Sequence, residues 1–254
     1  MTLTVTIDGP VATVTVDRPE ARNAMTMAMY EQLADFCVRV DEDENVRVAV
    51  VRGGPKAFVS GTDIGHFRDF TTAADGIDYE RRVETIYQRL EDVRVPTVAV
   101  VEGYATGGGL GIAAACDLRI CTPNARFGLP IARTLGNCVS MATYARLAHL
   151  VGAARTLHLI YTAGFVEAAA ALDIGLVHEL VAADDLDAHL AELCARLAAH
   201  APLTMRASKI ALRRLREHAL PPDEDLIALC YGSADFREGV SAFLGKRPPQ
   251  WQGR

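Results

Sequence analysis

The feature that most constrains the fold is a run of glycines where a buried strand meets a short helix. Gly-Tyr-Ala-Thr-Gly-Gly-Gly-Leu-Gly at 103–111 follows the apolar segment 97–101 and enters a small-residue helix expected over about 108–115. Glycines at such a junction let a ligand approach the backbone, and the first N–H groups of the helix point outward with partial positive charge. The segment therefore predicts a site that can hold a developing oxyanion.

Length and composition exclude several classes of protein. Half of the 254 residues are hydrophobic, which is enough for a sizeable core, and the formal charge is −6. A negative balance without a basic stripe argues against a nucleic-acid partner. Segment 1–16 lacks the pattern of a signal peptide, and no segment approaches the roughly 18 apolar residues of a membrane span. We therefore expect a cytoplasmic protein with no membrane partner.

The cysteines indicate buried, reduced thiols and no metal site. They form no CxxC pair and have no histidine at ligand spacing, so zinc is not expected. The six positions are Cys37, Cys116, Cys121, Cys138, Cys194 and Cys230.

Hydrophobic patterning predicts an α/β fold with a helical end. Alternating segments at 3–7 and 11–16 suggest a hairpin around Asp8-Gly9-Pro10. Repeated strand, strand, helix units follow, and the small polar segment 71–77 reads as a mobile lid loop before a helix over 78–92. From residue 141 onward almost everything is helical. We expect a core over 1–195 and a helical C-terminal region over 196–254, in one continuous fold.

A dinucleotide site is the main competing interpretation of the glycines. Gly-Leu-Gly-Ile-Ala-Ala at 109–114 fits the loose G-x-G-x-x-A pattern after a strand. Such a site needs an acid about 20 residues later to hold the ribose, and segment 127–133 contains none. Its first glycine also falls inside the expected helix. The pattern therefore does not favour a dinucleotide.

A second junction changes the interpretation. Lys-Ala-Phe-Val-Ser-Gly-Thr-Asp-Ile at 56–64 also leaves a strand, passes a glycine and enters a helix. Two junctions, each aiming a backbone N–H at one point, make an oxyanion hole without side-chain donors.

At this point the chain resembles the crotonase family, also called the enoyl-CoA hydratase/isomerase family. The resemblance covers about residues 3–247 and implies a crotonase-like spiral of repeated ββα units. The motifs that match, in family order, are Arg-Pro-Glu-Ala-Arg-Asn-Ala at 18–24, Ala-Phe-Val-Ser-Gly-Thr-Asp-Ile at 57–64, Gly-Tyr-Ala-Thr-Gly-Gly-Gly at 103–109, Cys-Asp-Leu-Arg-Ile at 116–120, Phe-Gly-Leu-Pro at 127–130, Gly164-Phe165 with Ala168-Ala169, and Gly-Leu-Val at 175–177.

The resemblance implies an acyl-CoA substrate and no separate cofactor, since coenzyme A is part of the substrate. The backbone N–H groups of Thr62 and Gly108 would hold the thioester carbonyl oxygen and favour its enolate. The helix that starts near Gly108 would add its dipole.

The resemblance also implies where coenzyme A and other subunits lie. The backbone from Ala57 to Ser60 would border the bent coenzyme, and Arg22 would meet its phosphates. In the family, the C-terminal helix of a neighbouring subunit can close over the nucleotide, which would place Phe243 and Lys246 there. Region 196–254 would then serve trimerisation, in a homotrimer or a dimer of trimers.

The chain departs from the family at both positions that carry glutamates in its hydratases. Those glutamates position and activate the water that adds to the enoyl double bond, and Gly111 and Ile131 stand in their places. Neither side chain transfers a proton, and losing such help costs about 10²–10⁴-fold per group. Hydration by the two-glutamate route is therefore not expected.

The segment after Pro130 is rich in polar groups that can replace the missing glutamates. We expect Arg133 to pair with a substrate carboxylate, and Asn137 or Ser140 to orient a water. Cys138 is a candidate nucleophile, although nothing nearby in sequence would lower its pKa.

Three further side chains are candidates for acid–base work. His66 follows the first junction by four residues and titrates near neutrality, but an exposed helix histidine is the more ordinary interpretation. Glu84 and Tyr87, on the helix after the expected lid, can reach the pocket if they swing inward.

Two classes of function remain open. One is an enzyme that polarises an acyl-CoA thioester and performs hydration, isomerisation or a related enolate reaction with non-standard acid–base groups. The other is an acyl-CoA binding protein that kept the oxyanion hole and lost catalysis. Arginine and asparagine in the loop after Pro130 favour the enzyme.

Overall fold

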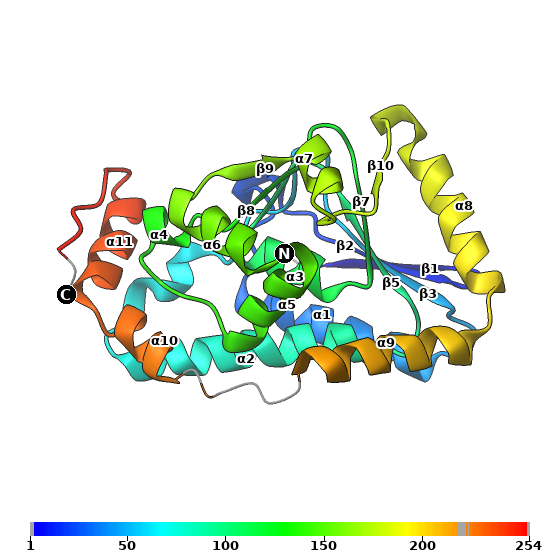
Figure 1. Ribbon diagram of the computed structural model, residues 1–254, viewed down its shortest axis with the longest axis horizontal. Coiled ribbons are helices and arrows are strands. Elements are labelled where there is room, and N and C mark those ends of the chain that lie inside the picture. Colours follow the sequence, from blue (N-terminus) through cyan, green and yellow to red (C-terminus); the bar gives the residue numbers. More distant parts are fainter. Residues whose placement is uncertain (1–2, 218–221, 223, 253–254) are drawn as a thin grey trace.

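The computed structural model describes residues 3–217, 222 and 224–252 (Figure 1). The strands are β1 (Thr4–Asp8), β2 (Val11–Thr15), β3 (Val48–Arg52), β4 (Ala57–Val59), β5 (Thr97–Val101), β6 (Tyr104–Thr106), β7 (Leu118–Cys121), β8 (Arg126–Gly128), β9 (Phe165–Glu167) and β10 (Glu179–Leu180). The α-helices are α1 (Met27–Glu42), α2 (Ala73–Asp92), α3 (Gly108–Ala115), α4 (Ile131–Thr134), α5 (Met141–Val151), α6 (Ala153–Thr162), α7 (Ala168–Asp173), α8 (Leu186–Ala199), α9 (Pro202–Glu217), α10 (Glu224–Tyr231) and α11 (Ala234–Leu244). Short 3₁₀ turns are η1 (Pro19–Ala21), η2 (Ile64–Asp69) and η3 (Ala183–Asp185).

The chain repeats a strand, strand, helix unit that feeds two sheets. The larger sheet has the strand order β1-β2-β3-β5-β7-β10, and the smaller one has the order β4-β6-β8-β9. Each of the units β3-β4-α2 and β5-β6-α3 gives its first strand to the larger sheet and its second to the smaller one. The pair β7-β8 continues the pattern before α4. This confirms the predicted mixed α/β fold of ββα units.

The larger sheet is covered on both faces, because successive side chains of a strand point to opposite sides. Val50 and Val98 pack with Leu193 of α8 on one face. Ala49 and Ala99, one position away, belong to the main core with the helices on the other face.

The predicted N-terminal hairpin is confirmed, and the predicted lid loop is wrong. β1 and β2 pair antiparallel with Asp8 opposite Val11. Within segment 71–77 the chain is already helical, because α2 begins at Ala73 rather than at the predicted residue 78. Thr72 caps it, because the Thr72 hydroxyl accepts from the Asp75 N–H while the Asp75 carboxylate accepts from the Thr72 N–H.

The C-terminal helices belong to the same fold as the core. α10 packs along α2, and α11 contacts η2 and α4. Tyr231 and Phe236 are part of the main hydrophobic cluster. Figure 1 shows α10 and α11 at one end of the molecule and α8 at the opposite end. The predicted boundary at 195/196 falls inside α8, so the division into two regions does not follow the helices. In the described part of the chain, no helix has the length and apolar character of a membrane span.

Candidate active site

A cavity of about 900 Å³ lies at the carboxyl ends of the smaller sheet. β4, β6 and β8 are parallel neighbours, so the segments that follow them leave the sheet at the same edge. These segments supply the centre of the cavity lining, namely Ser60, Gly61 and Thr62 after β4, Gly107 and Gly108 after β6, and Leu129, Pro130 and Ile131 after β8. Both junctions singled out in the sequence therefore meet at one cavity.

The bridge between Met25 and Thr62 sets the direction of the Thr62 amide. The Met25 N–H donates to the Gly61 carbonyl at 2.8 Å, and the Asp63 N–H donates to the Met25 carbonyl at 2.9 Å. In a parallel bridge of this kind, the residue between the two bonded neighbours points its own N–H the other way. The Thr62 N–H is thus directed away from Met25, on the side where β6 lies.

The second junction begins α3. Gly107 has φ of 53° and precedes the helix as its N-cap, a conformation that favours glycine. The first helical hydrogen bond runs from the Gly111 N–H to the Gly107 carbonyl, so the Gly108 amide comes before any acceptor within the helix. A Cβ placed on Gly61 would lie 3.9 Å from the Gly108 nitrogen, which shows how closely the two junctions approach.

A cluster of buried hydroxyl groups lies around Thr62 and Gly108. The Thr62 hydroxyl lies 3.0 Å from the Tyr30 hydroxyl and 2.7 Å from the Tyr79 hydroxyl. The Tyr87 hydroxyl donates to the Gly108 carbonyl at 3.1 Å. Burial raises the pKa of Tyr30, and it raises the pKa of Tyr79 and Tyr87 well above 10. All three phenols therefore stay neutral at physiological pH.

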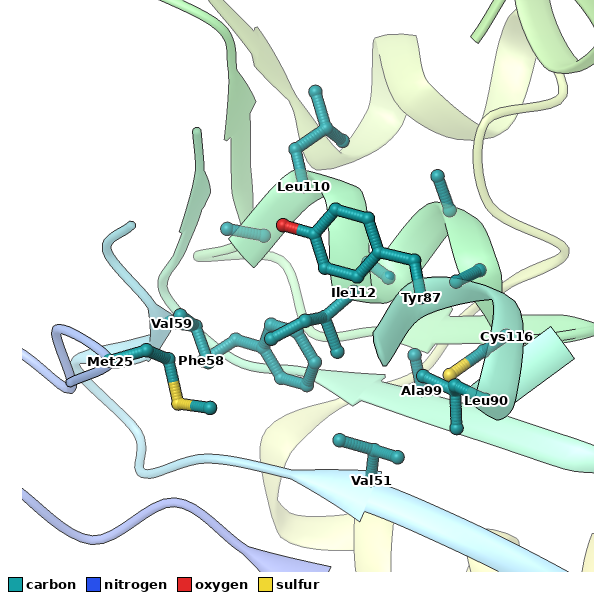
Figure 2. Close-up of a cluster of buried hydrophobic side chains, with 14 of the residues drawn as sticks. Met25, Val51, Phe58, Val59, Tyr87, Leu90, Ala99, Leu110, Ile112 and Cys116 are labelled. Atoms are coloured by element: carbon teal, nitrogen blue, oxygen red, sulfur yellow. The ribbon is translucent and has the colours of Figure 1, made fainter. Parts of the chain in front are cut away.

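The Tyr87 ring occupies the space beside Gly111. A Cβ on Gly111 would lie 2.7 Å from both the Cζ and the hydroxyl oxygen of Tyr87. Figure 2 shows the ring of Tyr87 beside Leu110 and Ile112 of α3, in the same buried cluster as Phe58. A side chain at position 111 and the tyrosine at position 87 therefore exclude each other.

This exclusion predicts a measurable coupling between the two positions. Gly111→Ala is expected to cost about 1–3 kcal/mol of unfolding free energy through overpacking, although alanine favours a helix. Tyr87→Leu removes the clashing atoms, so the double variant should lose less than the sum of the single losses by about 1 kcal/mol. Urea unfolding at fixed protein concentration measures all three variants. Losses that add would contradict the packing described here.

The mouth of the cavity carries the residues expected at coenzyme A. Arg22, Phe243 and Lys246 line it, and Ser60, which was also expected at coenzyme A, belongs to the segment after β4 described above. Phe243 and Lys246 reach this cavity from the same chain as the two junctions. The reason is the packing of α11 against η2, which folds the C-terminal segment back over its own core.

Arg133 and Asn137 also line the cavity, on the segment after β8. The Asn137 side-chain amide donates to the Tyr231 hydroxyl at 3.2 Å and to the Cys138 carbonyl at 3.1 Å. Its Oδ1 is buried and accepts no hydrogen bond from the described residues. Arg133 is exposed.

Two predicted site residues lie away from the cavity lining. The Ala57 carbonyl, in β4, already accepts from the Gly54 N–H at 3.1 Å and from the Asn23 side-chain amide at 2.7 Å. His66 is exposed on η2, where its ring packs on Phe67, Phe70 and Tyr79. Burial and the charge of Arg82 lower the pKa of His66, so its ring is neutral.

The other polar candidates on this side are held in buried contacts behind the cavity wall. The Ser140 hydroxyl donates to Glu84 at 2.7 Å, and Arg146 donates to the same carboxylate. Cys138 is buried, and its thiol hydrogen-bonds to Cys230. These contacts hold Glu84 in place and argue against the expectation that it swings inward.

The sequence interpretation missed Glu80, a buried carboxylate that lines the cavity from α2. A signal was present, because Glu80, Glu84 and Glu91 recur at helical spacing among Tyr79, Val83, Tyr87 and Leu90 on the apolar face of one helix. Carboxylates on an apolar face are rarely buried without a specific role.

Comparisons with known proteins point in one direction. A family model described as enoyl-CoA hydratase/isomerase matches residues 6–254. A short-chain-enoyl-CoA hydratase of Clostridium acetobutylicum is 33% identical over 245 residues, which cover 94% of this chain and 93% of that protein. A 2,3-dehydroadipyl-CoA hydratase of Escherichia coli is 33% identical over 244 residues, covering 94% of each.

Solved structures agree on the fold. A methylmalonyl-CoA decarboxylase complexed with 2S-carboxypropyl CoA superposes with a TM-score of 0.90 at 25% identity, covering 99% of this chain and 98% of that one. An enoyl-CoA hydratase from Mycobacterium avium subsp. paratuberculosis gives 0.85 at 28% identity, covering 98% of each.

Proposed function

This chain belongs to the enoyl-CoA hydratase/isomerase family, and from this premise we propose that its cavity binds an acyl-CoA thioester and stabilises the enolate. The carbonyl oxygen would accept hydrogen bonds from the backbone N–H groups of Thr62 and Gly108, aided by the dipole of α3. The observation that carries the proposal is the meeting of both strand-to-helix junctions at one cavity. Coenzyme A enters as part of the substrate, with no separate cofactor.

The lining divides into two regions that fit the two ends of such a molecule. The inner wall is mostly apolar, as an acyl chain requires, and includes Phe67, Val83, Leu129, Ile131 and Val139. The mouth carries two cations, Arg22 and Lys246, which suit the phosphates of coenzyme A.

The reaction proposed is a proton transfer on the acyl chain rather than the two-glutamate hydration of family hydratases. Position 111 is glycine with the Tyr87 ring beside it, and position 131 is isoleucine, so neither side chain moves a proton. Protonation of the enolate at the α-carbon or further along the chain gives exchange or isomerisation. On an acyl group with an α-carboxylate, loss of CO₂ leaves its C–C electron pair as the same enolate, which is then protonated. Arg133, at the cavity edge, is placed to meet a carboxylate on the acyl group.

We also propose that the chain assembles as a homotrimer or a dimer of trimers. Large apolar side chains stand exposed on α6 and α9, where a neighbouring subunit would cover them. They are Leu157, Tyr161, Leu203, Leu212 and Leu215.

The test combines binding with turnover on a panel of acyl-CoA thioesters. Butyryl-CoA is expected to bind in isothermal titration calorimetry. The rate of crotonyl-CoA hydration is expected to be lower by about 10²-fold or more than that of a hydratase with both glutamates. Hydration of crotonyl-CoA is measured by the loss of its enoyl-thioester absorbance. Turnover of a carboxylated acyl-CoA such as methylmalonyl-CoA is measured by mass spectrometry. Arg133→Ala should reduce turnover of the carboxylated substrate alone.

Three results would change this assignment. Fast crotonyl-CoA hydration would show that other groups replace the glutamates fully. Micromolar binding without turnover of any thioester would identify the chain as an acyl-CoA binding protein. No binding of any acyl-CoA would overturn the proposal.

A further inference from the structure

The cavity lining contains three carboxylates among the described residues, and they differ in their surroundings. Glu20 is exposed at the mouth, 3.7 Å from Arg18. Asp63 pairs with Arg18 at 2.6 Å and also caps η2 by accepting from the Gly65 N–H. Glu80 comes from α2 and is only 6% exposed. It is therefore the carboxylate that lies inside the wall of the cavity rather than at its rim.

Other titratable groups of the lining do not accept protons near neutral pH. The pKa values of Tyr79 and Tyr87 lie well above 10 because both rings are buried. Arg133 has a guanidinium, which has no acceptor capacity in proteins. Lys246 stands at the mouth. A base inside the cavity is thus to be sought at Glu80.

Two neutral donors hold the Glu80 carboxylate. The Ser140 backbone N–H donates to Oε2 at 3.0 Å, and the Tyr231 hydroxyl donates to Oε1 at 2.6 Å. The Asn137 side-chain amide in turn donates to the Tyr231 oxygen at 3.2 Å. Because that N–H occupies a lone pair of the phenol, the Tyr231 proton is directed toward Glu80. The carboxylate is fixed in one orientation.

Gly76, one helical turn before Glu80, leaves space for the Tyr231 ring. Gly76 and Glu80 lie four residues apart on the same face of α2. A Cβ on Gly76 would lie 2.1 Å from Cγ of Tyr231, so only glycine lets the ring lie against the helix there. The ring crosses Gly76, and its hydroxyl reaches Glu80. α10 therefore packs against α2 beside Glu80 through the contact of Tyr231 with Gly76.

We propose that the Glu80 carboxylate is the general base and acid of this cavity and that Tyr231 is its positioning residue. The inference rests on the proposed function. Glu80 takes a proton from the carbon next to the thioester carbonyl, and the C–H electron pair forms the C=C bond of the enolate. The negative charge moves to the carbonyl oxygen, beside the amides of Thr62 and Gly108. Return of a proton from neutral Glu80 to the acyl chain restores the carboxylate.

Exchange of the α-protons of butyryl-CoA with deuterium oxide tests this step without requiring the physiological substrate. Proton NMR follows the α-CH₂ signal in the presence of the full-length protein. We expect Glu80→Gln, which keeps the shape of the side chain and one of the two acceptor oxygens held by Ser140 and Tyr231, to slow exchange by about 10²-fold or more. Its dissociation constant for butyryl-CoA should stay within about threefold of wild type.

Asp78→Asn is the matched control. Asp78 lies two residues earlier on α2, carries the same charge, and is exposed outside the cavity lining. The Asp78→Asn variant should exchange the α-protons at the wild-type rate. The comparison then separates loss of the Glu80 carboxylate from loss of any negative charge on the helix.

The positioning role of Tyr231 needs a readout that a purely structural role would not move. Tyr231→Phe should slow exchange by about tenfold at unchanged binding, because Glu80 keeps its charge but loses its orientation. Combined with Glu80→Gln, it should slow exchange no further, since both changes act on one group. Should Glu80→Gln fail to fold, Tyr231→Phe alone decides, because normal exchange there would overturn the proposal.

The outcomes separate this inference from the proposed function. A wild-type protein that binds no butyryl-CoA refutes the proposed function itself. Binding with equal exchange in wild type and Glu80→Gln refutes only the role of Glu80. Binding without exchange in wild type refutes that role as well, because no proton then leaves the α-carbon. Additive losses in the double variant refute the link between Tyr231 and Glu80.

Discussion

Gly108→Ala is expected to lower kcat/KM for acyl-CoA turnover by about 10²–10³-fold, the usual effect of losing one donor of an oxyanion hole. The added Cβ would lie 2.1 Å from the Tyr30 hydroxyl and 3.3 Å from the Thr62 hydroxyl. Tyr30 is 0% exposed and its hydroxyl bonds to Thr62, so the ring has nowhere to retreat. The first turn of α3 must shift instead, and the Gly108 amide shifts with it.

A comparison of two ligands shows whether the carbonyl oxygen is the group affected. Butyryl-CoA and its thioether analogue S-butyl-CoA differ in the carbonyl, so wild type should prefer the thioester and Gly108→Ala should lose that preference. Gly54→Ala is the control, because a Cβ there meets its nearest neighbour at 3.9 Å, outside the cavity lining. Normal turnover by a folded Gly108→Ala variant would remove Gly108 from the reaction centre.

Arg146→Leu is expected to reduce the free energy of unfolding by about 3–5 kcal/mol, because it leaves the buried Glu84 carboxylate without its cation and removes one of the two cations of Glu91. The guanidinium is 1% exposed and lies 2.9 Å from Oε2 of Glu84 and 2.8 Å from Oε2 of Glu91. Glu91 also pairs with Arg216 at 2.6 Å. Glu84 loses its cationic partner in this variant, whereas Glu91 keeps Arg216 as a second cation.

The loss should depend on pH. Burial opposes ionisation of Glu91, but hydrogen bonds from Arg146 and Arg216 lower its pKa below 4.5. A carboxylate with a lowered pKa in the folded state stabilises the protein above its unfolded pKa, and that stability is lost as pH falls through the folded value. In Arg146→Leu, Glu91 loses one of its two cations, so its pKa rises and it takes up a proton more readily. The difference from wild type should therefore be larger at pH 7.5 than at pH 5.

Urea unfolding at the two pH values measures both effects. Arg82→Leu serves as the control, because Arg82 forms an exposed ion pair with Glu31 and should cost less than about 1 kcal/mol. Replacing Glu84 together with Arg146 by leucine should recover part of the loss. A loss below about 1 kcal/mol for Arg146→Leu would show that the buried network contributes little.

Local chemistry was enough to predict those parts of the fold that depend on neighbouring residues. The hairpin at Gly9, the strand that ends before Gly61 and the helix that starts at Gly108 all follow from turn residues and hydrophobic period. The start of α2 was missed because segment 71–77 is small and polar. Its capping box at Thr72 and Asp75 was nevertheless visible in the sequence.

The cavity lining was predictable where it follows from strand ends and glycines, and it was missed where distant helices meet. Helical spacing places Glu80 on the apolar face of α2, but its hydrogen-bond partner Tyr231, which packs on Gly76, lies in α10, far away in the sequence. The surroundings of Ala57 and His66 also depend on residues distant in sequence, because the Ala57 carbonyl accepts from Asn23 and the His66 ring packs on Tyr79.

Glycines and strand endings are properties of short segments, so the sequence by itself determined the two junctions, the repeated ββα units and the lack of carboxylates at positions 111 and 131. Only the tertiary structure decided which buried carboxylate faces the cavity, which are held by arginine, and that the C-terminal helix closes over its own chain. Burial and hydrogen-bond partners come from segments far apart in sequence, and their placement depends on packing of the whole chain.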